Sequence, residues 1–108
     1  MSVRKETKYL MDNYVRNRTN RGRKDTRACA LIFADFLASM GVKSLGQAGN
    51  AHVIKYWKAN RHREDGTQKN HYYAIKKLWE LYGKSNLPPE PRYKKQLSQN
   101  IIREVNPC

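Results

Sequence analysis

The stretch Thr26–Met40, TRACALIFADFLASM, decides the fold, because its apolar side chains repeat with the period of an α-helix. Intervals of three and four residues place them on one broad stripe of a helix surface. The members of this stripe are Cys29, Ile32, Phe33, Phe36, Leu37 and Met40. The small side chains on the other side, suited to close packing on a neighbour, are Ala30, Ala34 and Ala38. The pattern predicts a largely buried central helix, in which Cys29 is a small apolar core residue.

The ends of this helix carry capping residues. Asp25 or Thr26 can accept hydrogen bonds from the first free N–H groups, and Gly41 stands where a left-handed residue ends a helix. Before it, the stretch Arg16–Lys24 (RNRTNRGRK) is strongly basic and has nothing to bury, which predicts a basic loop or arm. The central helix is therefore expected over about residues 26–40.

Further helices are expected on both sides of the central one. Leu10, Met11, Tyr14 and Val15 predict a short helix within residues 3–16. Asn50 can cap a second helix whose inner side chains are Val53, Ile54 and Trp57. Thr67 can cap a third, which Gly83 closes and whose buried stripe is Tyr72, Ile75, Leu78, Trp79 and Tyr82. A last helix is expected from about Arg92, after a connector stiffened by three prolines, with Tyr93, Leu97, Ile101 and Val105 on one face.

No segment alternates with period two, so the sequence predicts an all-α fold. We expect a small bundle of four or five helices, with Phe33, Phe36, Trp57 and Trp79 as the bulk of its core. Residues 1–91 would form the folded domain with its basic N-terminal arm. Residues 92–108 would form a C-terminal helix or linker.

Charge is the strongest signal of function. The 108 residues include 22 Lys or Arg and 9 Asp or Glu, a formal net charge of +13. Such a surface attracts polyanions, of which nucleic acid is the commonest inside cells. No apolar run approaches the ~20 residues that a membrane-spanning helix needs, and residues 1–6 lack the apolar core of a signal peptide. Two cysteines are too few for a disulfide framework, so a cytoplasmic protein is expected.

Enzymatic and metal chemistry find no support in the sequence. His52, His62 and His71 are ten and nine residues apart, whereas structural zinc ligands come in closely spaced pairs. The acidic residues show no repeated spacing, and no glycine-rich phosphate loop follows a strand. We therefore expect no catalytic residue, no metal, no cofactor and no small-molecule substrate.

The third expected helix carries the residues suited to DNA. At 100° per residue, Lys69, Tyr73, Lys76 and Glu80 share the face opposite the apolar stripe, flanked by Asn70 and Lys77. Lysines there can neutralise phosphates, whereas Gln68 and Asn70 are side chains that can pair with adenine in the major groove. Tyr73 could stack on a base. The basic residues near the start of the central helix complete the candidate set: Arg21, Arg23, Lys24 and Arg27.

Three stretches together resemble a known family. Thr26-Arg27 followed by LIFADFL (31–37), then VIKYWK (53–58), then GTQKNHYYAIKKLW (66–79), resemble the three helices of a core-binding, SAM-like domain. This is the N-terminal DNA-binding domain of tyrosine recombinases, the phage integrases, and the layout is most similar to proteobacterial prophage integrases. The resemblance covers roughly residues 3–91 and rests on apolar positions and caps.

The resemblance implies a role in DNA integration and site-specific recombination. In that family the domain forms half of a clamp around duplex DNA, with two helices lying across the major groove. Carried over to this chain, the residues facing DNA would be Arg23, Lys24, Arg27, Lys69, Asn70, Tyr73, Lys76 and Lys77. The family's nucleophilic tyrosine and its partners belong to a second domain, which does not fit before Cys108. The chain is therefore expected to bind duplex DNA, with other recombinase protomers as further partners, and not to cut it.

Other functions fit the same composition. A free-standing regulator or directionality factor would share the fold and charge. A basic RNA-binding protein would prefer structured RNA over duplex DNA. A helical protein-interaction module would show no salt-sensitive binding to nucleic acid.

Overall fold

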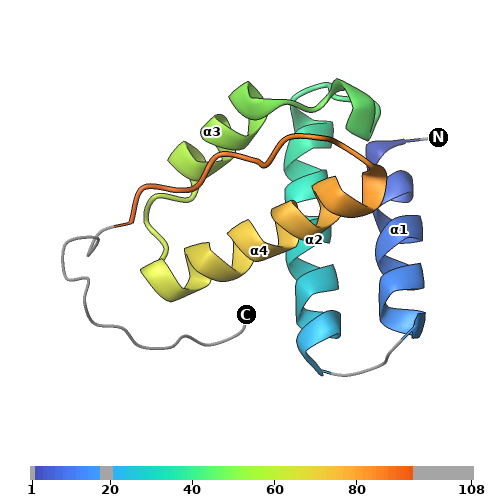
Figure 1. The fold of residues 1–108 in the computed structure, drawn as a ribbon. Coiled ribbons are helices and arrows are strands. Elements are labelled where there is room, and N and C mark those ends of the chain that lie inside the picture. Colours follow the sequence, from blue (N-terminus) through green and yellow to red (C-terminus); the bar gives the residue numbers. More distant parts are fainter. Residues whose placement is uncertain (1, 18–20, 94–108) are drawn as a thin grey trace.

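A hairpin of two antiparallel helices forms one side of the molecule (Figure 1). The computed structural model describes residues 2–17 and 21–93. Helix α1 spans Val3–Asn17 and α2 spans Arg21–Ser39. The short N-terminal helix expected within residues 3–16 is thus confirmed.

Helix α2 begins earlier than its sequence predicts. It starts at Arg21, so the predicted basic arm is largely the end of one helix and the first turn of the next. Thr26 does not cap the helix, because it lies inside it and its hydroxyl donates to the carbonyl of Gly22, 2.9 Å away. The basic residues of this stretch that the structure describes, Arg16, Arg21, Arg23 and Lys24, therefore lie on helices, whereas residues 18–20 lie outside the described residues.

Two further helices cover the hairpin. After the short 3₁₀ helix η1 (Leu45–Gln47), α3 runs over Asn50–Ala59 and α4 over Asp65–Tyr82. Helix α4 crosses α2, and α3 lies beside α4 and also packs against α2 (Figure 1). The described residues contain four α-helices and no strand, which confirms the all-α prediction. None of these helices is both long and apolar enough to cross a membrane.

Aromatic rings meet at the centre of the core. The ring of Tyr56 lies 5.0 Å from that of Phe33 and 5.1 Å from that of Phe36, both edge-on. Edge-to-face pairs of this kind add to the free energy gained by burial. Phe33, Trp57 and Trp79 are buried as predicted, whereas Phe36 is half-buried. Cys29 is buried too.

Burial differs from the predicted stripes at several positions. Ile54, expected to face the core, is 42% exposed. Tyr56 faces the core in its place, because the aromatic rings of α2 pack against that side of α3. Ile32 and Tyr82 are also exposed, whereas Ala30 and Ala34 are fully buried at a close approach of helices. On α4, the polar residues Gln68 and His71 are buried.

Residues 84–93 form an extended segment, here called the strap, that runs back between α4 and α3 (Figure 1). The indole Nε1 of Trp57 donates to the carbonyl of Pro89 at 2.9 Å, and Nζ of Lys84 donates to the carbonyl of Ala48 at 2.9 Å. The helix predicted from about Arg92 does not start there, because Arg92 and Tyr93 are not helical. The rest of that prediction lies outside the described residues.

Candidate nucleic-acid interface

Tyr14 of α1 lies where α1, α2 and α4 meet, and it gathers several of the predicted site residues. The Arg23 guanidinium carbon is 4.2 Å from the centre of the Tyr14 ring, and Nη1 of Arg23 donates to the Tyr14 carbonyl at 2.7 Å. The Lys77 ammonium is 5.5 Å from the same ring centre. Cations near an aromatic ring are attracted by its quadrupole. Arg23 of α2 and Lys77 of α4 thus lie around one side chain of α1.

Tyr73 joins the same group. Burial and then a hydrogen bond with the Tyr73 side chain raise the pKa of Tyr14 above its ordinary value. The Tyr73 side chain is nevertheless 48% exposed. Tyr14, Arg23, Tyr73 and Lys77 are here called the Tyr14 junction, which fixes the direction of α4 relative to the start of α2.

Two of the predicted cations are partly neutralised by acidic neighbours. Nε of Arg27 donates to Oδ1 of Asp12 at 2.7 Å, and Nζ of Lys77 lies 3.2 Å from Oε1 of Glu80. Hydrogen bonds from Lys8 and Arg27 hold the pKa of Asp12 below its ordinary value, so it stays charged at neutral pH. The Arg27–Asp12 pair joins α2 to α1, whereas the Lys77–Glu80 pair lies within α4.

Other predicted cations project into solvent. Lys69 and Lys76 are exposed on α4, on either side of Tyr73 along the helix, and Lys24 is exposed in the first turns of α2. The Arg21 side chain is 91% exposed, with a long 4.0 Å contact to Asp25. Among the described residues, Lys24 and Lys76 make no ion pair. We call Lys69, Tyr73 and Lys76 the outer row of α4, which is the part of the predicted site best placed to meet a polyanion.

The prediction for Gln68 is wrong in this structure. Its side chain is 2% exposed, because the strap and α3 cover that side of α4, so it cannot reach a base on the outer row. Asn70, the other predicted base-reading residue, is half-buried and lies on the other side of the outer row from Gln68. Of these two amide side chains, only Asn70 is therefore placed where it could contact a base.

Sequence reasoning missed Tyr14 as a member of the site. It was expected only as an apolar residue of the first helix, and its position gives no sign that two cations fold onto it. A helical wheel treats one helix at a time, whereas the Tyr14 junction is built from three.

Within the part of the chain that the structure describes, no group of three or more His, Cys, Asp or Glu could hold a metal ion. Comparison of the chain with protein-family models, curated proteins and solved structures gave no significant match.

Proposed function

We propose that this chain binds duplex DNA through the outer row of α4 and the first turns of α2, as the core-binding module of a tyrosine recombinase. The observation that carries the DNA-binding part is the pair of exposed lysines, Lys69 and Lys76, on either side of an exposed tyrosine. The recombinase part follows from the resemblance alone. In this proposal the protein acts in the cytoplasm and contributes binding, not strand cleavage.

Phosphate contacts supply most of the affinity in this proposal. Lys69, Lys76 and Lys24 are exposed, so their ammonium groups can replace the condensed counterions of DNA. Arg23 and Lys77, held on Tyr14, keep the two helices in register. Asn70 is then the side chain that contributes sequence preference through a base edge.

Fluorescence anisotropy with a labelled duplex at two salt concentrations tests the proposal. We expect Lys76→Ala and Lys69→Ala each to weaken binding to all duplexes several-fold and to reduce the slope of log K against log salt by about one. Asn70→Ala should instead reduce the preference among sequences.

Lys43→Ala is the matched control. It removes the same charge from an exposed lysine that follows α2, at the other end of this helix from Arg21. The 19 residues of α2 separate its two ends by about 27 Å. Equal losses from Lys43→Ala and Lys76→Ala would show binding by net charge without a defined face, and contradict the proposed site.

Single-stranded DNA and hairpin RNA are included as competitors. Tighter binding to the RNA would favour a basic RNA-binding protein. Absence of binding to any nucleic acid at low salt would favour a protein-interaction module.

A further inference from the structure

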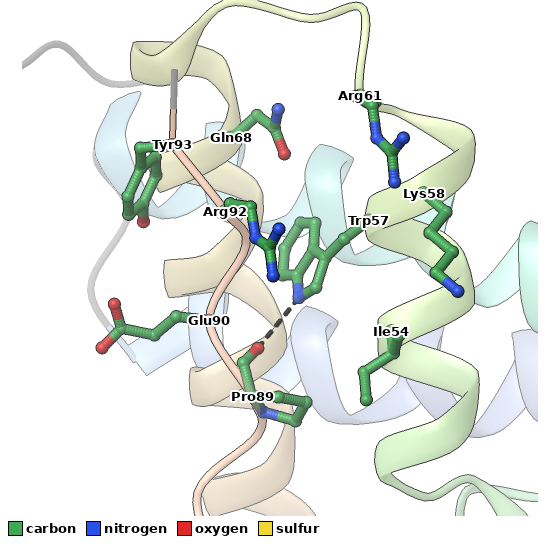
Figure 2. A pocket seen from close by; sticks show the side chains of 9 residues that line it. All are labelled: Ile54, Trp57, Lys58, Arg61, Gln68, Pro89, Glu90, Arg92 and Tyr93. Atoms are coloured by element: carbon green, nitrogen blue, oxygen red, sulfur yellow. Dashed lines mark hydrogen bonds between the residues drawn. The ribbon is translucent and has the colours of Figure 1, made fainter. Parts of the chain in front are cut away.

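A pocket of about 630 Å³ lies between α3, the first half of α4 and the strap (Figure 2). This volume is in the range of small-molecule sites in proteins. The pocket is separate from the outer row of α4, because it lies on the Gln68 side of that helix. None of its residues has a role in the function proposed above.

Gln68 presents an unpartnered acceptor to this pocket. Its Nε2 points toward the Arg63 carbonyl and donates a long hydrogen bond to it at 3.4 Å. The Oε1 atom is buried and has no hydrogen-bond partner among the described residues. Figure 2 shows the Gln68 side chain projecting from α4 into the space between α4 and α3. A buried carbonyl without a partner costs free energy, so this site favours a ligand that brings an N–H donor.

The rest of the lining favours a flat, anionic ligand. The rings of Trp57 and Tyr93 form part of the wall, and Lys58, Arg61 and Arg92 bring three positive charges. The acidic residue of the lining, Glu90, points away from Trp57 (Figure 2). Arg61 and Lys58 are exposed, so they can pair with an anion at the pocket mouth.

We propose that this pocket binds a single nucleotide that is not base-paired. Its nucleobase lies against the aromatic wall and donates an N–H to Oε1 of Gln68, while its phosphate pairs with Arg61 and Lys58. The ligand is a free mononucleotide or an unpaired nucleotide at the end of a DNA strand. The ammonium of Lys69, a residue of the outer row, lies 5.9 Å from the ring centre of Tyr93 in the pocket lining. The inference goes beyond duplex binding, since a paired base cannot enter the pocket.

The test is a titration of the ¹⁵N-labelled full chain followed by NMR. The probes are deoxynucleoside 5′-monophosphates, the corresponding deoxynucleosides and inorganic phosphate. We expect at least one monophosphate to shift the Trp57 indole and Gln68 side-chain amide signals, and to bind about tenfold more tightly than phosphate or nucleoside alone. Millimolar nucleotide that leaves both signals unmoved would overturn the proposal, as would equal binding of phosphate alone.

Variants separate the pocket from the duplex-binding face. Arg61→Ala, an exposed substitution that leaves the core intact, should weaken monophosphate binding and leave nucleoside binding unchanged. Gln68→Met keeps the length of the side chain, removes the acceptor and should abolish the advantage of nucleotide over phosphate. Lys76→Ala is the control and should bind mononucleotides as the wild type does. Unchanged nucleotide binding in Arg61→Ala would contradict the assignment.

Two duplexes, one blunt and one with a single unpaired nucleotide at its end, distinguish a free nucleotide from a strand end as the ligand. Tighter binding of the second, lost in Gln68→Met, identifies a strand end as the ligand. Equal binding of both duplexes, with mononucleotide binding intact, identifies a free nucleotide. If no duplex binds while mononucleotides still do, the proposed function fails and this inference stands. If duplexes bind and mononucleotides do not, this inference fails and the proposed function stands.

Discussion

His71 is a titratable side chain buried in the core, 5% exposed. Its Nδ1 and the hydroxyl of Tyr56 are hydrogen-bonded at 2.7 Å. Burial, with the charge of Arg63 as a smaller cause, lowers the pKa of His71 to about 4, and burial raises the pKa of Tyr56 to about 12. Both side chains are therefore neutral in the folded protein at pH 7, and the core contains no charge at this point.

The lowered pKa of His71 makes the protein sensitive to mild acid. Between about pH 6.5 and pH 4 the unfolded chain binds the proton and the folded one does not, so stability is fully present above pH 6.5 and falls as the pH drops. The loss amounts to about 3 kcal/mol by pH 4. Urea unfolding at pH 7.0, 5.5 and 4.5 measures it.

His71→Gln keeps a polar partner for Tyr56 and removes the titration. This variant should show a much flatter dependence of stability on pH in the same window. The lowered pKa of Asp12 acts below its ordinary value of 3.8 and so contributes at more acidic pH. An unchanged slope in His71→Gln would assign the acid sensitivity to other groups.

Helix α4 ends because Gly83 adopts a backbone that other residues avoid. Its φ is +100° and its ψ is 20°, the left-handed region, and its N–H bonds back to the carbonyls of Trp79 and Glu80. Nothing lies within 4 Å of the place where a Cβ would stand, so only the backbone disfavours a side chain there. The cap lets the chain turn directly into the strap.

Replacing Gly83 by Ala should destabilise the protein by about 1 kcal/mol, because Ala pays a steric penalty in this backbone region. Gly66→Ala is the matched control, since Gly66 lies in the first turn of α4 with open space around it and no positive φ. That change should be neutral or stabilise by about 0.5 kcal/mol. Thermal unfolding of both variants measures the difference, and destabilisation of equal size would contradict the role of the cap.

At the scale of the whole molecule, the net charge of +13 works against the folded state. Compaction brings like charges together. The ion pairs seen among the described residues lie on exposed or half-buried side chains, where each contributes little. Salt shortens the range of this repulsion from about 30 Å at 0.01 M to about 10 Å at 0.1 M.

Raising NaCl from 0.01 to 0.3 M should therefore raise the Tm, by about 5 °C if the gain is about 1 kcal/mol. Lys43→Glu lowers the net charge by two at an exposed position and should show a smaller rise. A Tm that falls with salt would mean that the ion pairs outweigh the repulsion. Differential scanning calorimetry measures both proteins.

How far the sequence predicts this molecule depends on the residue. The four-residue spacing of Cys29, Phe33 and Leu37 predicts a buried helix. Gly41 and Gly83 predict where helices end, because these signals are local. The predicted start of α2 is about five residues late, since Asp25 and Thr26 resemble caps when read alone. Which of Ile54 and Tyr56 is buried could not be predicted, because the ten-residue helix α3 carries apolar side chains on two faces.

The sequence by itself determined the helical class, the excess of positive charge and the outer row of α4, all of which depend on residue type and spacing along one chain. Tertiary structure alone decided that Arg23 and Lys77 meet at Tyr14, and that Gln68 turns from a surface residue into the buried acceptor of a pocket. The reason is physical. Helical period fixes the directions of side chains around one axis, whereas burial and pairing depend on which other helix or strap covers each direction.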